Sequence, residues 1–279
     1  MKNRKIDLIW EDLYRECPEK FDEALKNGVS YLDFDVVKRV SLNRGQDVRL
    51  SWSKDKENQN AKVLNDLGLS SLVVSKNKKV ALLNASIYYQ YPAPQNHIII
   101  KRDRKDKRNF SLEKTAYHTE NDLFIRFENI CKRHRIKEFP FRDRIHEGKT
   151  SLEKYDIELL CNKGTVFTVN GDNVAVEIDN IFDGAGGKCW YGVEKKCSSS
   201  IEAFKKEKYN LIQLYTCYEW LKENGLQKDR NYKYAMCVSF KNEPNKYIIY
   251  EIEFNNGILN DIKVTNSTLF EIVDSKARP

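Results

Sequence analysis

Two short acidic clusters lie on either side of a glycine-rich segment in VAVEIDNIFDGAGGKCWYGVEKK, residues 174–196. The first cluster contains Glu177 and Asp179, and the second contains Glu194 with Lys196 two residues later. Side chains alternate between the two faces of a β-strand, so each of these pairs shares one face of its own run. If the two runs form a hairpin with these faces aligned, the carboxylates and the lysine converge.

Converging carboxylates raise one another's pKa unless a cation lies between them. Oxygen ligands of this kind favour a hard cation, and Mg²⁺ is the default choice. A lysine beside the carboxylates places a second positive charge near any metal-bound water. These groups together have the parts needed for phosphodiester hydrolysis, because a metal activates water and the cations offset charge that develops in the transition state.

The same alternation is also typical of a solvated sheet face, which is the commoner origin of an acidic strand. The surrounding residues favour the metal-site interpretation, because they predict a central strand pair in which unpaired carboxylates would be costly. These flanking apolar residues are Val174, Val176, Ile178, Ile181, Phe182, Trp190 and Val193. The intervening DGAGGK lacks the spacing of a phosphate-binding loop, so we interpret it as a hairpin turn.

Short strands broken by glycines dominate the chain from residue 155 onward. We expect strands over residues 155–161, 164–171, 173–182 and 188–196, and two more over 233–241 and 246–254. Between them, residues 198–225 predict one long helix, with Ser200 as its N-cap and Gly225 at its end. The C-terminal half is therefore expected to be a sheet interrupted by a helix, an α/β arrangement.

The order of these groups resembles the PD-(D/E)xK nuclease superfamily. Its pattern is an aspartate that ends one strand, a variable turn, and Glu-x-Lys in the next strand. Here the aspartate is Asp179, fourteen residues intervene, and the second half is Glu194-Lys195-Lys196. The helix expected next also resembles the one that follows the Glu-x-Lys strand in such nucleases. One departure is that Ile178, rather than proline, precedes the aspartate.

The resemblance covers roughly residues 155–254 and implies an α/β (α+β) fold, a restriction-endonuclease-like mixed central sheet flanked by helices. It implies a Mg²⁺-dependent endonuclease that hydrolyses DNA phosphodiester bonds. The form that best suits the size of the chain is a type II restriction endonuclease that cuts a specific duplex site as a homodimer.

Carried over residue by residue, the resemblance implies that Asp179 and Glu194 hold Mg²⁺, with the backbone carbonyl of Lys195 as a further ligand. Lys196 would orient or activate the attacking water and stabilise the pentavalent phosphate. Glu177 is a candidate for assisting a second metal, and an exposed partner of a lysine is the alternative reading of that residue.

Gln213 is a candidate for contacting the site from the helix, since some of these nucleases carry a glutamine there. A solvent-facing position on the helix is the alternative. Two other functions stay open: a repair or defence nuclease on structured or nonspecific DNA, and a non-catalytic nucleic-acid-binding module. The intact set of Asp179, Glu194 and Lys196 argues against the second of these.

The N-terminal part predicts a separate mixed unit. We expect helices over residues 7–17, 19–28 and 55–69, and then a hairpin over 70–85. Helices followed by a hairpin resemble the winged-helix order, which is common among DNA-binding proteins. The predicted organisation is therefore an N-terminal DNA-recognition or accessory unit, residues 1–110, and a nuclease domain, residues 111–279.

Basic residues cluster in two places. The segment KRDRKDKRNF offers Lys101, Arg102 and Arg104 as candidate phosphate contacts. The alternative is a solvated loop without a binding function. Residues 119–136 predict a helix with one apolar and one basic face, the latter including Arg126. The apolar face consists of Leu123, Phe124, Phe127, Ile130 and Cys131.

Composition sets wider limits. The 279 residues include 48 Lys+Arg and 41 Asp+Glu, and the resulting net charge of +7 suits a polyanionic partner without establishing one. Seven scattered cysteines without a CxxC pair argue against a disulfide framework or a four-ligand zinc site. No apolar run is long enough to span a bilayer and the first residues make a poor signal peptide, so we expect a cytoplasmic protein.

Overall fold

The computed structural model describes residues 4–47, 56–75, 79–102, 120–151, 155–160, 166–171, 175–184, 189–215, 217–218, 231–255 and 261–274. The helices are α1 (Lys5–Glu16), α2 (Pro18–Asn27), α3 (Phe34–Asn43), the short 3-10 helix η2 (Glu57–Gln59), α4 (Lys62–Leu67), α6 (Glu120–Arg133) and α7 (Ile201–Lys205). Residues 212–215 and 217–218 are also helical.

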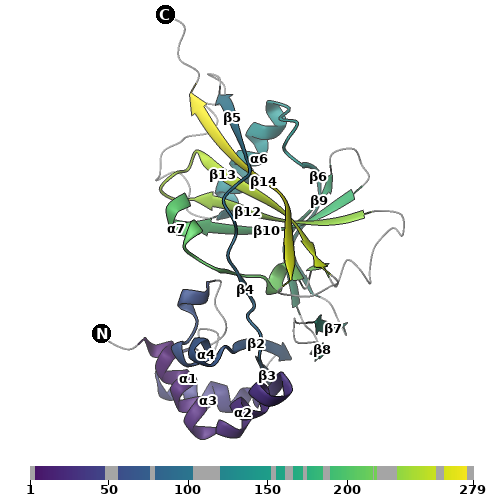
Figure 1. The fold of residues 1–279 in the computed structure, drawn as a ribbon. Coiled ribbons are helices and arrows are strands. Elements are labelled where there is room, and N and C mark those ends of the chain that lie inside the picture. Colours follow the sequence, from purple (N-terminus) through teal and green to yellow (C-terminus); the bar gives the residue numbers. More distant parts are fainter. Residues whose placement is uncertain are drawn as a thin grey trace, which may run out of the picture.

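The strands form one large sheet and several small ones (Figure 1). They are β1 (Val29–Asp33), β2 (Ser70–Ser75), β3 (Lys79–Leu83), β4 (Tyr88–Tyr89), β5 (Asn96–Arg102), β6 (Phe141–Ser151), β7 (Tyr155–Leu160), β8 (Val166–Gly171), β9 (Ala175–Gly184), β10 (Cys189–Ser198), β11 (Tyr209–Asn210), β12 (Asn231–Phe240), β13 (Lys246–Phe254) and β14 (Ile262–Asp274). The fold is therefore mixed, a large sheet flanked by helices with a smaller helical unit beside it.

The N-terminal unit contains α1 to α4 and an antiparallel sheet in the order β1-β3-β2, drawn in purple and blue at the bottom of Figure 1. It has its own core, in which Trp10, Phe21 and Val37 are fully buried. The helix α2 ends at Gly28, whose φ of 88° lies in the left-handed region that favours glycine. The first two helices and the β2–β3 hairpin confirm the sequence predictions, whereas the helix expected over 55–69 is reduced to η2 and α4.

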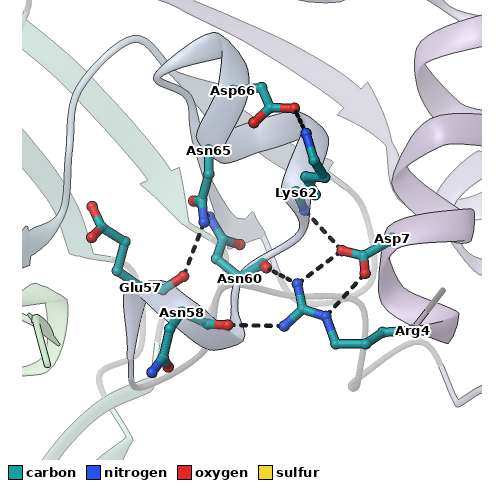
Figure 2. A network of polar contacts seen from close by, with 8 residues as sticks. All are labelled: Arg4, Asp7, Glu57, Asn58, Asn60, Lys62, Asn65 and Asp66. Carbon is teal, nitrogen blue, oxygen red and sulfur yellow. Dashed lines mark hydrogen bonds and ion pairs between the residues drawn. The ribbon is translucent and has the colours of Figure 1, made fainter. Parts of the chain in front are cut away.

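A polar network ties the η2 segment to α1 (Figure 2). The Arg4 guanidinium donates to both carboxylate oxygens of Asp7 at 2.9 Å, and to the carbonyls of Asn58 at 2.9 Å and Asn60 at 2.7 Å. Asp7 in turn accepts a hydrogen bond from the backbone N–H of Lys62 at 2.8 Å. The connection between η2 and α4 is therefore held to α1 at both of its ends.

The large sheet has the order β5-β14-β13-β12-β10-β9-β6. Its β10–β12 and β14–β5 pairs are parallel, and the other pairs are antiparallel. The hairpin of β9 and β10 confirms the strand pair expected from the alternation of apolar residues. β10 is buried along nearly its whole length, because it has a neighbouring strand on each edge and both of its faces are covered.

Alternate residues of the central strands enter two different cores. Trp190, Met236 and Val238 face one core, which also contains Leu83 of β3 and so joins the N-terminal unit to the sheet. Residues of the opposite parity, such as Val193, face a second core beneath α6. The predicted apolar face of α6 is confirmed, since Leu123, Phe124, Phe127, Ile130 and Cys131 are all buried.

The predicted basic face of α6 is wrong at Arg126, which is only 2% exposed. Its Nη1 donates to the carbonyl of Pro244 and, at 3.0 Å, to the hydroxyl of Tyr247. The side chain therefore serves the turn between β12 and β13 from inside the protein. Helical periodicity could not reveal this, because the acceptors lie more than a hundred residues further along the chain.

The single long helix expected over 198–225 is also wrong. Ser200 does cap α7, with its hydroxyl accepting from the N–H of Ala203 at 3.2 Å, but the helix stops after Lys205. Tyr209 and Asn210 instead pair with β4 as β11. A new helical segment begins at Ile212. The side-chain oxygen of Asn210 accepts a hydrogen bond from the N–H of Ile212 at 2.8 Å.

The sheet also recruits strands that the sequence did not indicate. β14 lies between β13 and β5, and β6 forms the edge beside β9. Because β5 ends at Arg102, the predicted division at residue 110 falls after a strand that belongs to the large sheet. Among the described residues, no helix combines the length and apolar character needed to cross a membrane.

The aromatic layer under α6 predicts a large stability effect. Phe182 is fully buried and stacks on Phe141 with ring centroids 4.9 Å apart. We expect Phe182→Ala to lower the free energy of unfolding by about 3–5 kcal/mol, measured by urea denaturation. Leu42→Ala, at a side chain that is 59% exposed, should change it by less than about 0.5 kcal/mol. Equal losses in the two variants would contradict this packing.

Candidate active site

The site begins where β9 and β10 stop pairing. Their register runs from Trp190 opposite Asp183 to Val193 opposite Asn180 and ends there. The next residues in line are Asp179 on β9 and Glu194 on β10, which the register would place opposite each other on one face. The separation of the strands therefore occurs at the two carboxylates that the sequence singled out.

The Asp179 carboxylate caps the end of this ladder. Its Oδ2 accepts a hydrogen bond from the backbone N–H of Lys195 at 2.7 Å. The side chain thus takes the acceptor position that a carbonyl of β9 would hold if pairing continued. Because the N–H and C=O of one strand residue point to the same edge, the Lys195 carbonyl also points to the β9 side of β10.

Glu194 and Lys196, the residues before and after Lys195, form a buried ion pair. The Lys196 Nζ lies 2.8 Å from Glu194 Oε1, and the two side chains are 7% and 4% exposed. A carboxylate or an ammonium buried alone would cost several kcal/mol, so each ion here requires the other. The alternative of a solvated strand face does not apply to these two residues.

Gln213 contacts the same lysine from the helical segment that packs on this face of the sheet. Its side-chain oxygen accepts a hydrogen bond from Lys196 Nζ at 3.0 Å. The cap at Asn210 starts the helical segment that carries it, and the buried neighbours Leu211 and Leu214 anchor that segment to the core. The interrupted helix therefore places Gln213 at the lysine, and the solvent-facing alternative for this residue is excluded.

The surroundings of Glu194 are apolar and contain Tyr91 and Cys217, both buried. Burial first, and the Glu194 charge to a smaller extent, raises the pKa of Cys217. The pKa of Tyr91 is raised by burial, with smaller contributions from neighbouring tyrosines and from Glu194. Both groups therefore stay protonated at neutral pH, and Cys217 is not a thiolate nucleophile.

Two other residues of the predicted site, Lys195 and Glu177, lie on the same two strands. The Lys195 side chain points to the opposite face, with its Nζ 5.4 Å from the centre of the Phe124 ring. Glu177 lies on β9 opposite Lys149, and its side chain is outside the described residues. Among the described residues, no group of three or more His, Cys, Asp or Glu side chains is arranged to hold a metal.

The candidate DNA contacts of the basic segment separate into different environments. Lys101 is exposed on β5, and Arg104 lies outside the described residues. Arg102 is buried, and its Nε donates to Asp274 at 2.5 Å, so this side chain is used within the sheet. β5 is the far edge of the sheet, with β14, β13 and β12 between it and β10.

A polar cavity of about 330 Å³ beside Lys196 was not expected from the sequence. Its other basic residues are Lys56, from the N-terminal unit, and Lys241, just after β12. No local pattern relates these positions, because the β10–β12 pairing brings Lys241 beside β10 and the contact of the N-terminal unit with β11 brings Lys56 there. In comparisons with known proteins, no family model, no curated protein and no solved structure matches the chain.

The buried ion pair predicts a specific pattern of stability. Lys196→Met leaves the Glu194 carboxylate buried without its cation, so we expect a loss of about 3–5 kcal/mol in the free energy of unfolding. Adding Glu194→Gln to that variant should recover most of the loss, because the uncompensated charge is removed.

The matched control is Lys205→Met, which breaks the exposed Lys205–Glu202 pair at 2.9 Å. Exposed pairs contribute about 0–1 kcal/mol, so this variant should unfold almost like the wild type. A Lys196→Met variant as stable as the control, or a double variant less stable than Lys196→Met, would contradict the role of the pair.

Proposed function

We propose that the chain is a Mg²⁺-dependent nuclease of the PD-(D/E)xK type that hydrolyses duplex DNA, in the manner of a type II restriction endonuclease. The observation that carries the proposal is the buried Lys196 ammonium, held 2.8 Å from Glu194 beside the point where Asp179 ends the β9–β10 pairing. A structural ion pair alone does not explain a second carboxylate at the same strand position.

The donor set fits a hard cation. Asp179 and Glu194 offer carboxylate oxygens at adjoining positions, and the Lys195 carbonyl points to the edge that Asp179 occupies. When bound, Mg²⁺ would lower the pKa of an attacking water and polarise a phosphoryl oxygen. Glu177 remains a proposed helper for a second ion.

Lys196 would position the attacking water and offset negative charge on the phosphate. An ammonium has three N–H donors and no acceptor, so it suits both tasks. Glu194 and Gln213 fix its direction in advance, which lowers the cost of reorganisation during the reaction. Gln213 is a positioning residue in this scheme, since its contact is with the lysine.

The rest of the fold is compatible with this assignment. α6 covers one face of the sheet, and the helical segment that carries Gln213 covers the other. In the N-terminal unit, α3 and α4 precede the β2–β3 hairpin, and we propose that this winged-helix-like order grips and reads DNA. A homodimer would match a palindromic site by its twofold symmetry.

Cleavage of long linear duplex DNA tests the function directly. With Mg²⁺ the wild type should produce discrete fragments, and with a chelator it should produce none. Asp179→Asn keeps the size of the side chain but removes a charged ligand, so it should slow cleavage by at least about 100-fold. Asp183→Asn makes the same change four residues along β9 and serves as the control.

The form of the products decides between the alternatives. Discrete fragments support a site-specific enzyme, whereas a smear indicates a nuclease that acts on nonspecific DNA. DNA binding without cleavage would instead indicate a non-catalytic binding module. Equal cleavage by wild type and the Asp179→Asn variant would show that the reaction occurs elsewhere in the protein.

A further inference from the structure

The cavity beside Lys196 is lined by polar groups from four parts of the chain. Lys56 precedes the η2 turn of the N-terminal unit and Gln59 is its last residue. Ser198 ends β10, Tyr209 lies on β11, and Lys241 follows β12. Its volume of about 330 Å³ is within the range of small-molecule sites. The site therefore exists only when the N-terminal unit is docked on the sheet.

The charge of the lining is positive. Of the residues that the structure describes, three lysines and no aspartate or glutamate line the cavity. Two of these lysines have carboxylate partners behind them, because Lys196 pairs with Glu194 at 2.8 Å and Lys56 pairs with Glu207 at 2.7 Å. Within the described residues, no acceptor contacts the exposed Lys241 side chain, so this part of the lining carries a net positive charge.

Glu207 contacts three residues of the lining, Lys56, Ser198 and Tyr209. It accepts hydrogen bonds from the Tyr209 hydroxyl at 2.6 Å and from the Ser198 hydroxyl at 3.5 Å, in addition to its ion pair with Lys56. Burial alone would raise the pKa of Glu207, but the hydrogen bonds from Lys56 and Tyr209 lower it. The carboxylate therefore stays ionised and keeps these groups in place.

The N-terminal wall of the cavity is equally well fixed. The Glu57 N–H donates to the carbonyl of Lys208 at 3.0 Å, and the Lys208 Nζ lies 2.9 Å from the Glu57 carboxylate. On its other side, the η2 segment is held by Arg4 through the carbonyls of Asn58 and Asn60 (Figure 2). The ion pairs of Lys56 and Lys196 hold these two lysines in place before any ligand arrives, and such preorganisation reduces the entropic cost of binding.

We propose that this cavity is a phosphate-binding subsite, and that it receives a backbone phosphate of the nucleic-acid strand next to the one that Lys196 contacts. Lysine ammonium groups bind phosphate as point charges, and hydroxyl and amide groups add hydrogen bonds. The inference rests on the proposed function for the identity of the ligand, but its chemistry depends only on the lining.

Binding in the presence of a chelator tests the subsite without any cleavage. The full-length chain is titrated with a short fluorescent duplex at several salt concentrations, and separately with inorganic pyrophosphate. Lys241→Gln removes an exposed charge without disturbing a buried pair, so it should lower the salt slope of duplex binding by about one unit. Lys263→Gln, at an exposed position on β14, should leave the slope unchanged.

Three outcomes are informative. A lower slope together with several-fold weaker pyrophosphate binding supports a subsite that a nucleic-acid phosphate occupies. Weaker pyrophosphate binding with an unchanged slope supports the phosphate chemistry but assigns the site to a free phosphate compound. Unchanged binding of both probes by Lys241→Gln overturns the proposal.

The subsite and the proposed function can fail separately. A lower salt slope in a protein that never cleaves DNA with Mg²⁺ would keep the subsite and overturn the nuclease assignment. Normal Mg²⁺-dependent cleavage by Lys241→Gln, with wild-type slope and pyrophosphate affinity, would keep the nuclease and overturn the subsite.

Discussion

A buried ion pair between two residues on one face of β10 determines which elements must cover this part of the sheet. Lys196 and Glu194 lie on the same face of β10, nearly out of reach of water, and neither could be buried without the other. Their burial requires a cover, which the helical segment after β11 provides, and Gln213 of that segment bonds directly to the lysine. The cover in turn depends on β4, which pairs with β11 and links the N-terminal unit to the sheet.

The strands β9 and β10 separate next to this ion pair. Pairing of β9 and β10 ends at Asn180 and Val193, immediately before the two carboxylates would face each other across the ladder. Asp179 instead bonds to the Lys195 N–H, so the backbone remains satisfied and the carboxylate stays partly exposed. We call the point where β9 and β10 separate, at Asp179 and Glu194, the fork. Backbone and carboxylate groups at such a fork can contact a ligand, whereas in a continuous ladder the backbone groups are paired with each other.

Local patterns in the sequence were sufficient for the elements that depend on local physics. Alternation predicted the β9–β10 hairpin, and helical periodicity predicted the buried face of α6. The same reasoning grouped Asp179, Glu194 and Lys196 as candidates, because residue parity on a strand fixes which side chains share a face, whereas Gln213 was a candidate only through the family resemblance. Features that depend on distant partners could not be obtained this way. The helix over 198–225 is broken by a strand that pairs with Tyr88 and Tyr89, and Arg126 turns inward to acceptors beyond residue 240. The Lys56 side of the cavity likewise results from docking rather than from any nearby motif.

Metal binding by the chain without DNA tests most directly whether the fork between β9 and β10 is a catalytic centre. Mn²⁺ prefers the same oxygen ligands as Mg²⁺ and can be titrated into the protein while electron paramagnetic resonance measures the free ion. We expect the wild type and Asp183→Asn to bind an ion with equal affinity. Asp179→Asn should bind it more than about tenfold less tightly, since even an outer-shell partner contributes that much. Equal binding by Asp179→Asn and the wild type, or no binding by either, would contradict a metal centre at this fork.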